Sequence, residues 1–142
     1  MLVNSIQTVR KIKKILFADD DADERILFEN IYQGRKDIQV LPTLLNGSDV
    51  IKKLNTLDDH ELPDLIILDQ NMPLMNGKQT LSFIKSNEKW SKIPVCICST
   101  YADHQLVEDC VRLGAYKVTS KPITEAEYQK MMDNFLNVFE GK

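Results

Sequence analysis

The sequence predicts an α/β fold in which helices cover both faces of a parallel sheet. Short runs such as Leu65–Leu68 are apolar at every position, which is typical of strands buried on both faces. Between these runs, apolar residues recur at helical spacing. Strict alternation of strands and helices requires right-handed crossovers and therefore a parallel sheet.

Five strands are expected. One of them is weak because it contains Pro42, and proline cannot donate to a sheet ladder, so we expect that strand at an edge. The expected strands are Ile15–Ala18, Ile38–Leu45, Leu65–Leu68, Val95–Cys98 and Ala115–Thr119.

Five helices are expected in the intervals, around residues 27–34, 50–57, 80–84, 106–114 and 124–139. Gly34 and Gly114 predict the ends of the first and fourth helices, because glycine readily adopts the left-handed conformation that closes a helix. Thr124 and Glu127 have the spacing of a capping box, which predicts the start of the last helix.

Length and composition indicate one globular domain that binds neither nucleic acid nor membrane. The chain has 142 residues, 43% of them hydrophobic, which suits a single domain. Its net charge of −3 argues against a general nucleic-acid binder. Residues 1–14 contain no signal peptide, and no apolar run reaches about 18 residues. We therefore expect a cytoplasmic protein.

The three cysteines fit a reducing compartment. An odd number of cysteines without a secretory segment is typical of cytosolic proteins. Cys96 and Cys98 alternate with apolar residues, so both should lie on one face of a strand as buried core thiols. The alternative is a zinc site, for which His104 is the nearby candidate ligand.

Polar side chains follow four of the predicted strands. Asp19 and Asp20 follow the first strand, Asp69 the third and Ser99 the fourth, while Lys121 comes shortly after the fifth. Because ligands of open parallel sheets bind beyond the carboxyl ends of the strands, we expect these groups to converge on one rim.

Such a cluster would need a cation. Asp19, Asp20 and Asp69 together with Lys121 carry a net charge of −2, and two carboxylates about 4 Å apart repel by roughly 4 kcal/mol at an effective dielectric near 20. Oxygen ligands alone select Mg²⁺, with Mn²⁺ as an alternative. A carboxylate, a cation and a lysine suit phosphoryl transfer through an aspartyl phosphate.

Four segments resemble the receiver domain of two-component response regulators. The resemblance covers about Lys14 to Phe139 and implies a stand-alone receiver with a flavodoxin-like (βα)5 sheet of order 2-1-3-4-5. It divides the chain into a lead-in over residues 1–13, which contains a basic cluster that we interpret as solvated, and a receiver domain over residues 14–142. The four segments are Leu16–Asp21, Leu65–Gly77, Pro94–Ser99 and Lys121–Pro122.

The resemblance also implies roles for single residues. Asp69 would accept a phosphoryl group from a histidine kinase or a phosphotransfer protein. Mg²⁺ would be held by Asp20 directly, by Asp19 through water, by Asp69, and by the backbone carbonyl of Asn71. Ser99 and Lys121 would bind the phosphoryl group, and the Lys121–Pro122 bond would be cis.

Three positions, Val118, Gln70 and Thr100, depart from the family pattern. Val118 stands where the family has its switch aromatic; Tyr101 is one candidate substitute and Tyr116, expected on the same face as Val118, is another. Thr100, larger than the residue that the family often has beside the hydroxyl, is expected to slow access to Asp69, and Asn71 and Tyr101 are expected to tune the phosphoryl lifetime. Gln70 replaces an apolar residue after Asp69.

We therefore expect a phosphorylation switch rather than an enzyme. With no DNA-binding output domain, its output would be recognition by a downstream protein of the surface formed by the fourth helix, fifth strand and fifth helix. We expect a monomer or a weak homodimer. The alternatives are a small Mg²⁺-dependent phosphohydrolase and a pseudo-receiver that binds partners without phosphorylation.

Overall fold

The computed structural model describes residues 11–141, so most of the expected lead-in, with Arg10 of its basic cluster, lies outside the described residues. Five parallel strands form one sheet in the order β2-β1-β3-β4-β5, as expected. The strands are β1 (Lys13–Ala18), β2 (Ile38–Val40), β3 (Leu65–Asp69), β4 (Val95–Ser99) and β5 (Lys117–Ser120).

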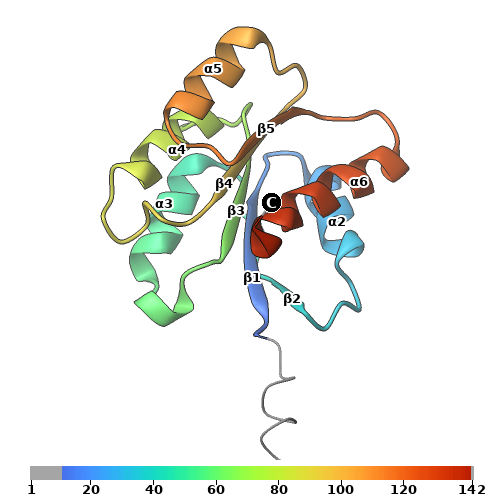
Figure 1. The fold of residues 1–142 in the computed structure, drawn as a ribbon, viewed down its shortest axis with the longest axis horizontal. Coiled ribbons are helices and arrows are strands. Elements are labelled where there is room, and N and C mark those ends of the chain that lie inside the picture. The colour runs from blue at the N-terminus through green and yellow to red at the C-terminus, as the bar shows by residue number, and fades with distance from the viewer. Residues whose placement is uncertain (1–10, 142) are drawn as a thin grey trace, which may run out of the picture.

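Helices cover both faces of the sheet, with α2 and α6 on one side and α3, α4 and α5 on the other (Figure 1). The described residues also form two short 3-10 helices, η1 (Asp59–Glu61) and η2 (Leu136–Glu140). Within residues 11–141 the α-helices are α2 (Ala22–Ile31), α3 (Gly47–Thr56), α4 (Gly77–Lys85), α5 (His104–Arg112) and α6 (Glu125–Phe135).

The alternation of side chains in β1 divides the interior into two cores. Ile15 and Phe17 pack with α2 and α6, and the ring of Phe17 stacks on Phe28 at 4.1 Å between centroids. Leu16 and Ala18 point the other way and pack with α3, α4 and α5. The side chains of these four residues are 2% exposed or less, which explains why the last four positions of the strand are all apolar.

The edge strand β2 is shorter than the sequence predicts. It ends at Val40, two residues before Pro42, although the edge position itself is confirmed. Beyond β2 the chain keeps isolated contacts with β1, because Leu41 N donates to Ile15 O and Leu44 N to Phe17 O, both at 3.0 Å. Proline has no N–H to continue the ladder.

Thr124 is the N-cap of the last helix, as predicted, but this helix ends at Phe135, earlier than expected. Thr124 Oγ1 accepts from Glu127 N at 3.2 Å, which is the first half of a capping box. Glu127 Oε1 accepts from the Thr124 hydroxyl instead of the backbone N–H, so the second half is not formed. After Phe135 the backbone tightens into η2, which ends at Gly141 with φ 76°.

All three cysteines are buried as free thiols, as expected. Cys96 and Cys98 lie in the core beneath α2 and α6, while Cys110 lies in the opposite core. Burial raises the pKa of the Cys98 thiol well above its ordinary value, which makes it a poor nucleophile and metal ligand. His104 is exposed at the start of α5, so the alternative of a zinc site has no support.

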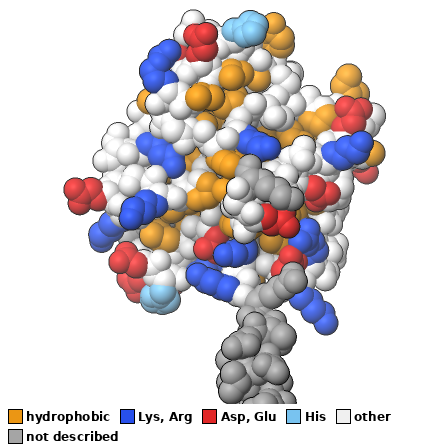
Figure 2. Space-filling view, viewed as in Figure 1, with side chains coloured by type: hydrophobic (Ala, Val, Ile, Leu, Met, Phe, Trp, Pro, Cys, Tyr) orange, Lys and Arg blue, Asp and Glu red, His pale blue; other side chains and the backbone are white. Residues whose placement is uncertain are grey.

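The described surface carries mixed charges. Figure 2 shows acidic and basic side chains interspersed over one face, with apolar groups between them. Among residues 11–141, no helix combines the length and the apolar character needed to cross a bilayer.

Candidate functional site

Three carboxylates meet at the carboxyl ends of β1 and β3. Asp19 and Asp20 directly follow β1, and Asp69 is the last residue of β3. One oxygen from each lies within 4.8 Å of those of the other two. Asp19 and Asp69 are only 1% and 4% exposed, whereas Asp20 is exposed. The backbone N–H of Asp21 donates to Asp19 Oδ1 at 3.0 Å and thereby orients that carboxylate.

Lys121 enters this cluster from the loop after β5. Its Nζ donates to Asp19 Oδ2 at 2.9 Å and lies 3.2 Å from Asp69 Oδ1. Its backbone N–H donates to Ser99 O at 2.7 Å, which ties the loop to β4. The Lys121–Pro122 bond is trans, so the expected cis bond is wrong for this structure. The trans form is the ordinary preference even before proline, and with it the ammonium already reaches both carboxylates.

The pKa values of Asp69 and Lys121 both lie above their ordinary values, but for different reasons. Burial, together with the charge of Asp19, raises the pKa of Asp69 to about 6, and Lys121 only partly offsets this rise. Burial alone would lower the pKa of Lys121, but the hydrogen bond and charge of Asp19 and the charge of Asp69 hold it above its ordinary value. The lysine therefore stays charged, while the site keeps an excess of negative charge.

The donor set fits a hard divalent cation. Asp69 Oδ1 is buried and has no well-formed hydrogen bond among the described residues, because its approach to Lys121 is an ion pair only. Carboxylate oxygens are the ligands that Mg²⁺ and Mn²⁺ prefer. Asp19, Asp20 and Asp69 could hold such an ion. Asn71 lies two residues farther along the loop and is exposed, so its part in cation binding stays a prediction.

Ser99 lies beside the site but is not directed at Asp69. It is 3% exposed at the end of β4, and its hydroxyl donates to Tyr101 O at 3.1 Å. The following backbone N–H, that of Ala102, donates to Ser120 Oγ at 2.9 Å. These two hydrogen bonds hold the β4–α5 loop, so Ser99 would have to leave the Tyr101 carbonyl before it could serve a group on Asp69.

The residues expected to tune the site differ in how far they are exposed. Thr100 and Tyr101 are exposed, with Tyr101 at 76%, and Val118 is half-buried against the core of α3, α4 and α5. Tyr116 packs on the opposite core, so the expectation that it shares a face with Val118 is wrong. The reason is that β5 begins only at Lys117, and the two-residue alternation does not extend to Tyr116.

Two residues around Asp69 have structural roles that sequence reasoning missed. Gln70 Oε1 accepts from Lys78 N at 2.8 Å and so caps α4 from outside the helix, which accounts for the polar residue at this position. A Cβ on Gly77 would lie 2.7 Å from Asp69 O. The start of α4 therefore packs directly on the end of β3, and glycine permits that approach.

A fourth carboxylate, Glu24, was also missed. It lies in the first turn of α2, and its Oε1 is 3.6 Å from Lys121 Nζ. Burial raises the pKa of Glu24, and Lys121 opposes that rise. The signal in the sequence was an acidic residue soon after the Asp19–Asp20 pair, which is also what the first turn of any helix favours.

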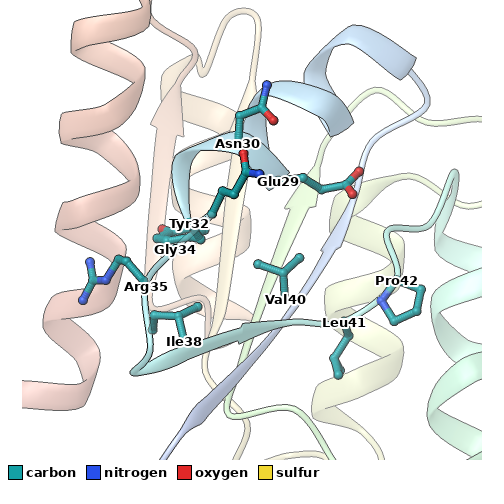
Figure 3. A pocket seen from close by; sticks show the side chains of 10 residues that line it. Glu29, Asn30, Tyr32, Gly34, Arg35, Ile38, Val40, Leu41 and Pro42 are labelled. Atoms are coloured by element: carbon teal, nitrogen blue, oxygen red, sulfur yellow. The ribbon is translucent and has the colours of Figure 1, made fainter.

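A separate cleft lies between the end of α2 and β2 (Figure 3). Its two charged side chains, Glu29 and Arg35, point to opposite ends of the cleft. Because these groups do not converge, we place the candidate site at the acidic rim. The cleft is lined by Glu29, Asn30, Tyr32, Gln33, Gly34, Arg35, Ile38, Val40, Leu41 and Pro42.

Comparison with known sequences gives one consistent result. A family model described as the response regulator receiver domain matches residues 15–133. A protein-glutamate methylesterase/protein-glutamine glutaminase of Clostridium acetobutylicum is 32% identical over 125 residues, which are 87% of this chain and 34% of that protein. The Bacillus subtilis protein of the same name is 32% identical over 77% of this chain and 29% of its own length. The chain thus spans about a third of these relatives.

Solved structures agree on the fold. The Mn²⁺-bound response regulator Rcp1 superposes with a TM-score of 0.78 at 24% identity, covering 89% of this chain and 94% of that one. The phosphorylated cyanobacterial phytochrome response regulator RcpA gives 0.77 at 25% identity, with 89% and 92% covered. The CheY of Borrelia burgdorferi, solved with CheX, BeF3 and Mg²⁺, gives 0.75 at 25% identity and 89% coverage of both chains.

Proposed function

Because this chain belongs to the response regulator receiver family, we propose that it is a phosphorylation switch of two-component signalling. In this proposal Asp69 accepts a phosphoryl group from a histidine kinase or a phosphotransfer protein. The observation that carries it is the buried Asp69 carboxylate, which lies 3.2 Å from Lys121 and shares a cluster of oxygens with Asp19 and Asp20. We do not extend the esterase name of the longer relatives to these residues, because the match covers only about a third of each.

The chemistry follows from the charges around Asp69. One carboxylate oxygen of Asp69 forms a bond to phosphorus as the bond from phosphorus to the donor histidine nitrogen breaks, and the ring, which carries a proton on its other nitrogen, leaves as neutral imidazole. Asp19, Asp20 and Asp69 would hold a divalent cation, which would supply positive charge for the transferred oxygens. Lys121 stays charged and stands beside the accepting oxygen, where it orients the group and offsets its charge.

We further propose that the output is carried by the β4–α5 loop and the surface next to it. A phosphoryl group carries up to about two negative charges in place of the single charge of the Asp69 carboxylate, and it would attract the Ser99 hydroxyl away from Tyr101 O. That exchange breaks one of the two hydrogen bonds that hold the loop. The loop leads into α5, so a partner protein that contacts α5, β5 and α6 would detect the change. The complex of a neighbour with CheX supports a protein partner.

Acetyl phosphate tests this function without a kinase. The protein is incubated with the donor and Mg²⁺, and its intact mass is measured with and without EDTA. We expect an increase of one phosphoryl group in wild type that is absent in Asp69→Asn and in EDTA. An exposed control, Asp59→Asn, should be modified like wild type. Steady release of phosphate from monoesters without an adduct would instead favour the hydrolase, and neither product would favour a pseudo-receiver.

A further inference from the structure

Glu24 is a fourth acidic side chain at the site, and the proposed phosphoryl transfer assigns it no role. It projects from the first turn of α2 toward Lys121, with Oε1 at 3.6 Å from Nζ. Its other oxygen, Oε2, is buried and has no hydrogen-bond partner among the described residues. The side chain is 26% exposed, so this carboxylate is partly removed from water with the lysine as its nearby cation.

Lys121 is therefore shared among three carboxylates. An ammonium group has three N–H donors, and three acidic residues surround this one. The contact with Asp19 is a hydrogen bond of 2.9 Å, while Asp69 and Glu24 approach to 3.2 and 3.6 Å. If one of these contacts is weakened, the ammonium can approach the other two carboxylates more closely.

We propose that Glu24 is a positioning residue that draws the Lys121 ammonium partly away from Asp69. The inference rests on the proposed function, because it concerns the relative affinity of the same site for Mg²⁺ and for a phosphoryl group. With Glu24 present, the aspartates are less fully neutralised by Lys121 and attract a divalent cation more strongly. The same carboxylate opposes the phosphoryl group, because it competes for Lys121 and adds a repelling charge.

Removing the charge of Glu24 should change the affinities for Mg²⁺ and for a phosphoryl mimic in opposite directions. In Glu24→Gln, Lys121 pairs more closely with the aspartates and competes with Mg²⁺, so the unmodified protein binds Mg²⁺ more weakly. A phosphoryl mimic then gains a fuller contact with Lys121 and loses a repelling charge, so it binds more tightly. A variant that only disturbs the fold would weaken both ligands.

The experiment measures both affinities by NMR chemical-shift titration of backbone amides. Mg²⁺ is titrated into the unmodified protein, and beryllofluoride, a non-covalent phosphoryl mimic, is titrated at saturating Mg²⁺. For Glu24→Gln we expect Mg²⁺ to bind about two- to fivefold more weakly and beryllofluoride about two- to fivefold more tightly, the range of partly exposed ion pairs.

Asp23→Asn is the matched control. Asp23 lies next to Glu24 in the same helical turn but is exposed, so its removal should leave both affinities near wild type. The proposal would be overturned if Glu24→Gln changed both affinities in the same direction or changed neither. It would also be overturned if Asp23→Asn changed both affinities as much as Glu24→Gln does. Wild-type protein that binds neither ligand would overturn the proposed function itself, and the role of Glu24 with it.

Discussion

Replacing Asp69 with asparagine should stabilise the metal-free protein at neutral pH. Burial and the charge of Asp19 raise the pKa of Asp69 from 3.8 to about 6. A carboxyl whose pKa is higher in the folded state binds its proton more tightly there. The folded state is therefore penalised as the pH rises from the unfolded pKa to the folded one, and the full penalty persists above pH 6.

The size of the effect follows from the same values. At about 1.4 kcal/mol for each pKa unit, the rise from 3.8 to about 6 corresponds to about 3 kcal/mol at pH 7. Asp69 is 4% exposed, so solvent screening removes little of this energy. Asp69→Asn should gain most of it, because the amide is nearly isosteric and carries no charge.

Urea denaturation in EDTA, followed by circular dichroism between pH 4 and 7, measures the effect. The stability difference between Asp69→Asn and wild type should be largest at pH 7 and should shrink through the window from 6 to 3.8. Asp23→Asn, which removes an exposed carboxylate, should show no such gain. Equal stability of Asp69→Asn and wild type at pH 7, or a gain that does not change with pH, would refute the reasoning.

Three further substitutions test the packing and charge of the site. Gly77→Ala places a Cβ 2.7 Å from Asp69 O and should cost about 1–3 kcal/mol; an unchanged urea midpoint would contradict this close approach. Leu74→Gly should raise stability by about 0.5 kcal/mol, because Leu74 has φ 67° and is 82% exposed; a loss of stability would show that its side chain makes a needed contact. Lys121→Met leaves Asp19 and Asp69 without their buried cation, so the EDTA-treated protein at pH 7 should lose about 3 kcal/mol and bind Mg²⁺ more tightly in calorimetry; weaker Mg²⁺ binding would argue against competition between the lysine and the cation.

The sheet and the convergence of the acidic rim could be predicted because each depends on a local pattern. A strand that is apolar on both faces must be covered on both faces, and a parallel sheet brings all its carboxyl ends to one rim. Asp69 and Lys121 therefore meet at 3.2 Å although 52 positions separate them in the sequence. No knowledge of side-chain packing was needed for that result.

The details that could not be predicted depend on where elements end. The expectation for Tyr116 failed because β5 begins at Lys117, two residues later than the predicted start at Ala115. The cap that Gln70 provides for α4 depends on a loop that folds back on the strand, and the sequence shows only an unusual polar residue. In the sequence, Glu24 is indistinguishable from any acidic residue in a first helical turn. Only the structure shows that the loop after β5 places Lys121 beside it.

Borohydride reduction tests the central claim most directly. Borohydride converts an aspartyl phosphate to homoserine, and the modified residue can be located by tandem mass spectrometry after digestion. Following incubation with acetyl phosphate and Mg²⁺, our account predicts homoserine at position 69 and an otherwise unmodified acidic rim. Homoserine at position 19 or 20, or at no aspartate while wild type still gains the mass of a phosphoryl group, would contradict it.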